Sequence, residues 1–553
     1  MPTTNNFNNR LIYEPGFYSR ITYGGQVLTF ASSYGNVCLI DTNKNAGYGG
    51  GSGINGELAS KKKAIYEFTD REEAKAFLKG GLFWDLMDYL FSPSNNGNGI
   101  PKIYLIKAAT TEAAGITLSF NAGTIVCKAR TEGLFGNGVI SSSKVRKGYG
   151  AKVIAGIIDP NKFIVELQEG QFHGLDADSD PYDGILQADA EPLIIRSPEV
   201  QDIDEIIDWM KNDAVFNNYF IFSSFTEPTT TTTTTSGTTT TTTTVATWYG
   251  DLIPSDISNN PLTAFSGGTE SYTNDDLDDA LACISELDNS FFLCDQYGSE
   301  SGGVKNNKIL TYINNDSEFS KIMFVGGGSD STEFSNYSIA TALAYNTSKV
   351  TVVHSGVQVP KVIGSGLKDK DSIYTAALAL GRIAGLEPQV PGTWKDLRII
   401  SPIHDLTANE RRQALIGGVL HMKYIPLLGW VINQSINTLQ KNTQLINPDG
   451  QSFEISITRI SNQLNKEMVL NGRINFIGGN ANTVSPVEIK SFVESFLRQR
   501  TATKTVDGLI LLFQNVKVTL KGDSYYVTYE YMPNGPINKI FSTGFALNIN
   551  LTA

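Results

Sequence analysis

The sequence predicts a mixed α+β and α/β protein of several domains, and three observations lead to this prediction. The chain has 553 residues, 41% of them hydrophobic, which is enough to bury more than one core. Short apolar runs alternate with helical patterns in residues 26–110 and again in 263–370, as they do in an α/β layer. Residues 111–262 instead show strand-like runs separated by turn residues. We therefore expect an α/β main domain that is interrupted by an inserted β-rich outer domain and followed by an α+β C-terminal domain at 371–542.

The first part of the main domain has the order strand, helix, helix, strand. A strand pattern within residues 26–40 leads into a glycine-rich loop. The next helix has Thr69 or Asp70 as its N-cap, because either side chain can accept hydrogen bonds from the first free backbone N–H groups. A second helix is expected at 82–91 and a buried central strand at 102–107.

The inserted domain has a β-rich part and a threonine tract. Strand-like runs fill residues 118–169, and a helix is expected near 200–212. Two blocks of seven threonines surround Ser236 and Gly237, within a linker at 229–244. Such a tract offers little to a hydrophobic core, so we expect a solvated loop or linker. A stalk that carries sugar is the alternative, but no secretory signal pattern opens the chain.

The second part of the main domain, residues 263–370, returns to alternating helices and strands. An acidic helix is expected at 274–287. The apolar runs at 291–294, 322–328 and 349–355 are short and are separated by helical patterns. Parallel strands need crossover connections of this kind, so a parallel arrangement is expected.

The C-terminal domain begins with a helix rich in alanine and glycine, and the segment 372–398 is the most distinctive in the chain. Five residues fall on one apolar face, and three small ones allow another backbone to approach closely. The five are Ala376, Ala377, Leu380, Ile383 and Ala384, and the three are Ala379, Gly381 and Gly385. Further along, residues 407–410 form a capping box that opens another helix.

A later helix runs from Ser485, its N-cap, to Arg500. We expect its inner side to contain Val487, Phe492 and Phe496, with Ile489 as a further candidate. Its outer side would then present basic residues. Together with one more basic residue just beyond the helix, they form a candidate contact for a partner protein. The candidate contact residues are Lys490, Arg498, Arg500 and Lys504.

An alternating pattern near the C-terminus predicts a hairpin with one buried face. The pattern consists of Val516, Val518, Leu520, Tyr525, Val527 and Tyr529. The two ends of the chain, 1–25 and 543–553, are expected to be extended arms that add strands to a neighbouring molecule, because a terminal strand needs a partner. Their apolar residues are Leu11, Ile12, Tyr13, Phe17, Ile21, Phe545, Leu547, Ile549 and Leu551.

Charge and composition exclude several functions. The net charge of -12 argues against a surface that wraps nucleic acid, which needs basic side chains. No apolar run is long enough to span a bilayer, and we expect no membrane insertion. The four cysteines lie far apart in apolar surroundings and are expected to be buried free thiols. They are Cys38, Cys127, Cys283 and Cys294.

The sequence predicts no catalytic residue, no cofactor and no metal. The turn at Gly326–Ser329 could cradle a phosphate, but it lacks the full spacing of a nucleotide-binding loop, as does Gly364–Lys368. Aspartates gather at 176–183, yet Pro181 stands where a calcium-binding loop needs glycine. The four histidines show no paired-ligand spacing. They are His173, His354, His404 and His421.

Several of these segments, taken in order, resemble contractile bacteriophage tail sheath proteins. The resemblance extends over most of the chain and is most specific after Asp371. The threonine tract departs from the family's pattern. The matching segments are the arm before Pro15-Gly16, the turn Gly133–Gly138, the entry at Gly267-Gly268, the helix at 374–397 and the Ile436-Asn-Thr-Leu439 strand.

The resemblance implies a mechanical function. Sheath subunits of this family form six-membered rings stacked helically around an inner tube, and contraction from a metastable extended state drives that tube through the bacterial envelope. The arms would complete a sheet on a neighbour's C-terminal domain by strand exchange, and the basic helix end would face the tube. The implied partners are further copies of this chain, the inner tail tube protein, and baseplate and tail terminator proteins, without direct contact to nucleic acid. The implied location is the phage tail, assembled in the host cytoplasm.

Three other functions remain open from the sequence. The chain could be the sheath of a phage-like contractile injection device. An α/β enzyme that binds a nucleotide at Gly326–Gly328 is a second alternative. A secreted adhesive or stalk protein glycosylated on the threonine tract is the third.

Overall fold

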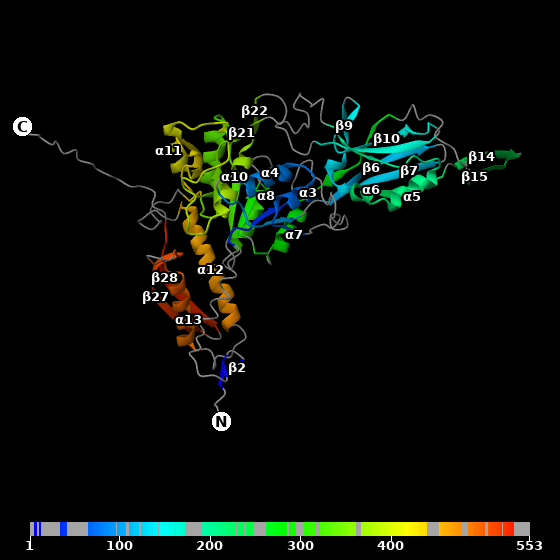
Figure 1. The fold of residues 1–553 in the computed structure, drawn as a ribbon. Helices are drawn as coiled ribbons and strands as arrows, with labels where there is room; N and C mark the ends of the chain where they lie inside the picture. The colour runs from blue at the N-terminus through cyan, green and yellow to red at the C-terminus, as the bar shows by residue number, and fades with distance from the viewer. Residues whose placement is uncertain are drawn as a thin grey trace, which may run out of the picture.

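The computed structural model has the predicted mixed α+β architecture with several domains, and Figure 1 shows its layers as a ribbon. An α/β region with helices on both sides of a sheet lies beside a β-rich region and a smaller α+β region. The structure describes residues 5–7, 10–12, 34–40, 65–95, 97–106, 110–120, 123–141, 143–160, 162–171, 191–227, 229–236, 239–246, 261–271, 273–284, 287–288, 290–294, 304–315, 321–360, 366–439, 453–476, 485–503, 507–521 and 524–535.

A seven-stranded sheet forms the centre of the main domain, in the order β24-β20-β19-β18-β3-β5-β4. Every neighbouring pair is parallel except β4 and β5. This confirms the expected parallel arrangement. The strands are β3 (Val37–Ile40), β4 (Ile65–Phe68), β5 (Ile103–Ile106), β18 (Phe291–Cys294), β19 (Ile322–Gly326), β20 (Val350–Val353) and β24 (Val419–Leu420).

Both faces of this sheet are covered, which explains why its strands are continuously apolar. Successive residues alternate between two hydrophobic cores, so that Phe291 and Leu293 enter one and Phe292 and Cys294 the other. The first core contains α3 (Arg71–Leu78), α4 (Leu82–Phe91) and α10 (Ser372–Ala384). The second contains α7 (Asn274–Ile284), α8 (Val304–Asn315), the π-helix Phe334–Ile339, α9 (Ala340–Tyr345) and α11 (Ala408–Gly417).

The caps of two helices follow the sequence. Asp70, rather than Thr69, caps α3 by accepting from the backbone N–H groups of Glu72 and Glu73. Thr407 and Glu410 form the predicted capping box at the start of α11.

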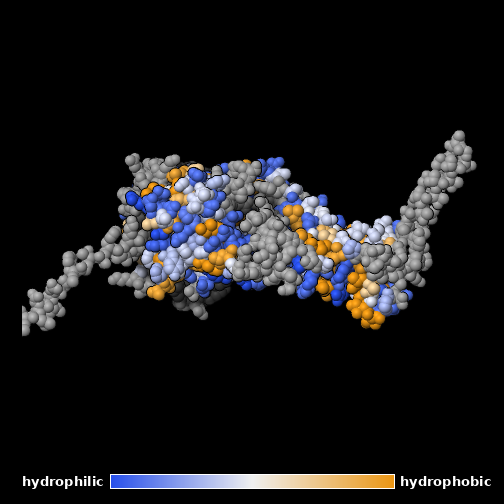
Figure 2. Space-filling view, turned by 90° about the horizontal axis from the view of Figure 1, so that it is seen from above, coloured by the Kyte–Doolittle hydropathy of each residue, from blue (hydrophilic) through white to orange (hydrophobic). Residues whose placement is uncertain are grey.

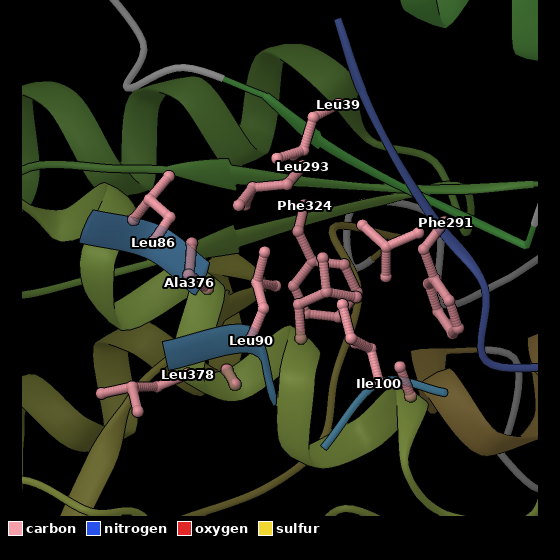
Figure 3. Close-up of a cluster of buried hydrophobic side chains, with 14 of the residues drawn as sticks. Leu39, Leu86, Leu90, Ile100, Phe291, Leu293, Phe324, Ala376 and Leu378 are labelled. Carbon is pink, nitrogen blue, oxygen red and sulfur yellow. The ribbon is translucent and has the colours of Figure 1, made fainter. Parts of the chain in front are cut away.

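Helix α10 is buried on every side, whereas the sequence analysis expected one apolar face. All thirteen of its residues are buried, because it lies between the main sheet and α4. Figure 3 shows side chains from the sheet, α4 and α10 gathered in this core. Its glycines have the expected role. A Cβ at Gly381 would lie 2.6 Å from the carbonyl oxygen of Leu90, and one at Gly385 would lie 2.2 Å from that of Asn98.

Replacement of Gly381 by alanine is expected to destabilise the protein by about 1–3 kcal/mol, because the new methyl group meets backbone atoms of α4 that cannot turn away. Gly472 provides a matched control, since it also lies inside a helix but a Cβ there meets nothing within 4 Å. Gly472→Ala should stabilise by about 0.5–1 kcal/mol. Urea unfolding of both variants checks the prediction, and equal effects of the same sign would contradict it.

The outer domain has two four-stranded sheets around a third hydrophobic core. One sheet has the order β13-β7-β6-β17 and the other β12-β11-β10-β16. Helices α5 (Ile203–Asn212) and α6 (Ala214–Tyr219) and a small β8–β9 hairpin (Val139–Ser141 and Lys144–Lys147) complete this region. The strands are β6 (Thr110–Phe120), β7 (Gly123–Glu132), β10 (Tyr149–Ala155), β11 (Phe163–Glu169), β12 (Leu193–Arg196), β13 (Phe220–Thr226), β16 (Thr263–Ala264) and β17 (Thr269–Ser271).

The threonine tract is not the loop that the sequence analysis expected. Strand β14 (Thr229–Ser236) pairs antiparallel with β15 (Thr239–Ala246) from end to end. Threonine is β-branched and favours extended backbone, so two such blocks can form a ladder without a core. This hairpin is a two-stranded sheet of its own, and Figure 1 shows it at the far end of the outer domain.

The C-terminal region contains α12 (Ile455–Phe476), α13 (Pro486–Gln499) and the hairpin β27 (Ile510–Lys521) and β28 (Ser524–Pro533). They share a fourth core. Ser485 caps α13 as predicted. Val487 was predicted to lie inward, but it is 72% exposed, and Ile489 and Val493 are buried instead.

Two short sheets are formed by residues between β20 and α12 in the sequence. One has the order β22-β21-β23, formed by Leu367–Lys370, Val357–Pro360 and Ser401–Pro402. The other pairs β25 (Met422–Ile425) with β26 (Gly429–Ile432). The Ile436–Leu439 segment is not a regular strand, which corrects the sequence analysis. Ile436 makes one isolated bridge, and Thr438 donates its backbone N–H to Val350, so the segment is held by side-chain burial and single contacts.

Candidate assembly surfaces

The β27–β28 hairpin has one half-buried face and one exposed face. Val516, Val518, Tyr525, Val527 and Tyr529, five of the residues predicted to receive a neighbour's strand, contact the core formed with α12 and α13. Leu520, the sixth, lies near the turn and is exposed. The two strands pair with each other over their length, and no third strand joins them within the described residues. Ile510, at the start of β27, is bonded to the backbone of Arg500 and Ala502, whereas the rest of the two edges is left for pairing.

The N-terminal arm contains a short hairpin in the described part of the chain. Strand β1 (Asn5–Phe7) pairs with β2 (Arg10–Ile12), so that Leu11 is opposite Asn6 and Ile12 opposite Asn5. The other predicted arm residues lie outside the described residues. They are Tyr13, Phe17, Ile21, Phe545, Leu547, Ile549 and Leu551.

The predicted basic contact on α13 is only partly present. Lys490 is exposed and lies 3.7 Å from Glu494 one helical turn away, and Arg498 is exposed. Arg500 was expected to face outward, but its side chain is only 8% exposed, and its Nε donates to a carboxylate oxygen of Glu467 on α12 at 2.7 Å. Lys504 lies outside the described residues.

Helix α12 connects the C-terminal core to the main domain through buried cations. Arg459 donates to the carbonyl oxygens of Leu386 and Glu387, just beyond the end of α10, at 2.5 and 3.3 Å. Burial lowers the pKa of Arg459 to about 9, and its guanidinium lies over the ring of Phe291. Two turns further along the same helix, Lys466 pairs with Asp288. The helix is thus fixed to the main domain by charge-assisted contacts in addition to apolar ones.

The glycine turn after β19 has its own polar groups where a phosphate would bind. The backbone N–H of Gly328 donates to the hydroxyl of Ser338 at 2.7 Å, and that of Ser329 donates to a carboxylate oxygen of Glu333 at 2.6 Å. The N-terminal residue of α10, Ser372, donates its hydroxyl to the carbonyl oxygen of Gly327. A phosphate-binding turn needs free N–H groups, and a carboxylate beside them repels an anion. The turn is therefore a structural junction between β19 and α10.

Two histidines that are distant in sequence, His354 and His404, meet near this turn, which sequence spacing did not indicate, and His421 is near enough to His354 to affect its charge. The hydroxyl of Ser338 lies 2.8 Å from Nδ1 of His354, whose Nε2 lies 3.0 Å from Nδ1 of His404. Nε2 of His404 lies 3.6 Å from Glu410. Burial, reinforced by His404 and His421, lowers the pKa of His354 to about 3, and burial lowers that of His421 to about 4.

Neither metal nor thiol chemistry is indicated by the described part of the chain. No group of three or more histidine, cysteine, aspartate or glutamate side chains there could hold a metal ion. Cys38, Cys127 and Cys294 are buried free thiols as expected, and Cys283 is only partly buried. The aspartates at 176–183 and His173 lie outside the described residues. Among the helices of the described residues, none has the length and apolarity needed to cross a membrane.

Comparison with known structures identifies the class of fold as that of sheath tail proteins. The sheath tail protein of Desulfitobacterium hafniense superposes with a TM-score of 0.52 at 15% sequence identity, covering 90% of this chain and 96% of the other. The sheath tail protein Lin1278 of Listeria innocua gives a TM-score of 0.47 at 14% identity, covering 92% of this chain and 99% of the other.

Comparison of sequences leads to the same class. The tail sheath protein of Bacillus phage SP01 is 27% identical over 225 residues, which is 40% of this chain and 37% of that protein. The match thus spans little more than a third of the relative's length. No family model matches the chain. The resemblance to contractile tail sheath proteins that the sequence segments suggested is confirmed by this relative and by the shared fold.

Proposed function

We propose that this protein is a structural subunit of a contractile phage tail sheath, which polymerises helically around an inner tube and contracts to drive the tube through the bacterial envelope. The similarity to a phage tail sheath protein, on a fold shared with a sheath tail protein, carries the proposal. The protein is not an enzyme in this proposal, in keeping with a glycine turn whose N–H groups are used internally.

The proposed partners are further copies of the chain, arranged as stacked six-membered rings, together with the tube, baseplate and tail terminator proteins. Contacts between different faces of identical subunits generate a helix when they do not close into a ring. The chain carries such contacts in the form of strand edges on β27 and β28 and apolar terminal segments. The proposed location is the phage tail after assembly in the host cytoplasm.

We also propose that the chain is divided as the sequence analysis expected, into arms at 1–25 and 543–553, a main domain at 26–110 and 263–370, an outer domain at 111–262 and a C-terminal domain at 371–542. The hydrophobic cores support most of this division. The third core consists of residues from Ala114 to Phe265, so it extends a few residues past 262 together with strands β16 and β17, and the fourth core consists of residues from Ile460 onward. Helix α10, however, packs in the core of the main sheet, so the two domains meet along this helix.

If the arms exchange strands between subunits, their removal should prevent assembly. Deletion of residues 1–20, or of 543–553, should leave folded monomers that no longer form tubes or rings, because main-chain pairing between subunits is lost. Negative-stain images and analytical ultracentrifugation give the readout. Removal of the β14–β15 hairpin, residues 229–246, is a control of similar size, since among the described strands these two pair with each other and with no third one. Arm-deleted protein that polymerises like the full chain would refute strand exchange by the arms.

A further inference from the structure

Exposed apolar side chains gather on the β25–β26 hairpin and on the segment beside it. Leu427, at the tip, is 104% exposed. Figure 2 shows that apolar residues form several separate patches on the surface seen from above. We call the exposed apolar residues of this hairpin and the adjacent segment the hairpin face. It consists of Trp394, Ile400, Tyr424, Leu427 and Leu428, each at least half exposed.

The hairpin face is held rigidly, because the segment 394–400 runs along β26. Trp394 and Leu397 donate their backbone N–H groups to the carbonyl oxygens of Ile432 and Trp430, at 2.8 and 2.9 Å. The indole N–H of Trp430 donates to the carbonyl oxygen of Ile400 at 2.9 Å, and its ring contacts that of Tyr424. A rigid aromatic and aliphatic surface loses little side-chain entropy when a partner covers it.

Leu427 is unfavourable in the isolated chain for two independent reasons. Its φ of 73° lies in the left-handed region, which suits glycine or asparagine far better than leucine. Its whole side chain is in contact with water. Strained residues of this kind cluster where function requires them. A leucine in this position is explained if its side chain is buried in an assembly.

The charges around the hairpin face favour an acidic partner. The segment 394–400 and the hairpin at 422–432, which form this face, contain three basic side chains, Lys395, Arg398 and Lys423, and one acidic one, Asp396. The whole chain has the opposite balance, 44 basic against 56 acidic residues. The acidic side chain, Asp396, is paired internally with Arg382. A second copy of this chain thus offers the complementary charge.

We infer that the hairpin face is a contact between subunits, in which the tip residues Leu427 and Leu428 are buried against a second copy of this chain while the basic side chains beside them face its acidic groups. This contact is separate from strand pairing at the β27–β28 edges. The inference rests on the proposed function, because it requires that the chain assembles with copies of itself. A heterologous contact of this kind presents different faces of the same chain to each other.

The variant Leu427→Asn separates folding from assembly. Asparagine tolerates a positive φ, so the monomer should keep or raise its melting temperature. Assembly should need a concentration higher by roughly tenfold or more, because one buried leucine is lost from every contact. Leu427→Asp should weaken assembly at least as strongly. Ile158→Asp is the matched control, since Ile158 is an aliphatic residue on the outer domain that is 89% exposed.

Purified protein without any tube protein is assembled across a concentration series and measured by light scattering and negative-stain microscopy. Normal assembly of Ile158→Asp, together with impaired assembly of both Leu427 variants, supports the inference. If the Leu427 variants assemble like the unchanged chain, the hairpin face does not contact a second copy, while the proposed function stands. Equal impairment by Ile158→Asp would also overturn the inference. If the unchanged chain forms no tubes or rings, the proposed function fails and the inference with it.

Discussion

Replacement of Arg500 by alanine is expected to lower the free energy of unfolding by about 3–5 kcal/mol, although Arg500 stands at the end of a surface helix. The substitution leaves Glu467 without its cationic partner, and the Glu467 side chain is only 3% exposed. Gln463 also donates to Glu467 at 2.7 Å, but one amide does not replace a guanidinium. The lost contact of Arg500 with the ring of Phe496 adds to the effect.

Arg498→Ala is the matched control for this prediction. Arg498 is the same residue type two positions earlier on the same helix, and its side chain is exposed. Its removal should change the free energy of unfolding by no more than about 0.5 kcal/mol. Urea unfolding followed by circular dichroism measures both variants. A similar, small loss for the two would mean that the Arg500–Glu467 pair contributes nothing to folding.

The error about Arg500 shows how much of this helix the sequence could reveal. Its start at Ser485 and its end near Arg500 were predicted correctly. Its inner face was predicted only in part. Phe496 and Ile489 are buried as expected, but the buried set continues to Val493 and Arg500, with the spacing of four, three and four that marks one side of a helix, and it leaves Val487 exposed. Arg498 and Arg500 are two positions apart and so point to nearly opposite sides. Arg500 was expected to face outward because it is charged, although its spacing from Ile489, Val493 and Phe496 places it on the inner side of the helix.

Other features could not be predicted from local patterns. Helix α10 is rich in small residues, which indicated close packing, but its burial on all sides depends on α4 and the main sheet together. The threonine tract has no apolar periodicity, so only β-propensity pointed to a hairpin. The histidine cluster joins residues fifty positions apart, His354 and His404, through the crossover connections of a parallel sheet. No spacing rule covers such a distance.

The histidine cluster should make the protein sensitive to mild acid. The hydroxyl of Ser338 accepts from Gly328 and donates to Nδ1 of His354, whose Nε2–H then donates to His404, so the neutral form of His354 satisfies the network. A proton on Nδ1 would remove the acceptor that Ser338 uses. Other groups coupled to His354 are His421, Glu410 and Asp330, and the two carboxylates only partly offset the cost of burying a cation.

The direction of the two pKa shifts determines whether acid stabilises or destabilises the folded protein. Both His354, with a pKa of about 3, and His421, with a pKa of about 4, bind protons less readily in the folded state than in the unfolded chain, where histidine titrates near 6.5. The unfolded state therefore gains protons first as the pH falls, so the stabilising effect is complete above pH 6.5 and is lost toward pH 3–4. At pH 5 each histidine should have cost about 2 kcal/mol relative to pH 8.

Unfolding by urea at a series of pH values between 8 and 5 tests this prediction, because the lowered carboxyl pKa values, such as that of Glu410, affect stability only at lower pH. The midpoint urea concentration should fall steadily below pH 6.5. His354→Gln should be less stable at pH 8 but should lose roughly half of the pH dependence, since one of the two buried imidazoles is gone. A midpoint that stays constant from pH 8 to pH 5 would mean that His354 and His421 are already protonated, or accessible to water, in the folded protein.

Ser338 and His354 link the turn after β19 to the π-helix, so the acid-induced loss of structure should begin at this turn. Faster hydrogen exchange of the Gly328 backbone N–H should therefore be the first local change to appear.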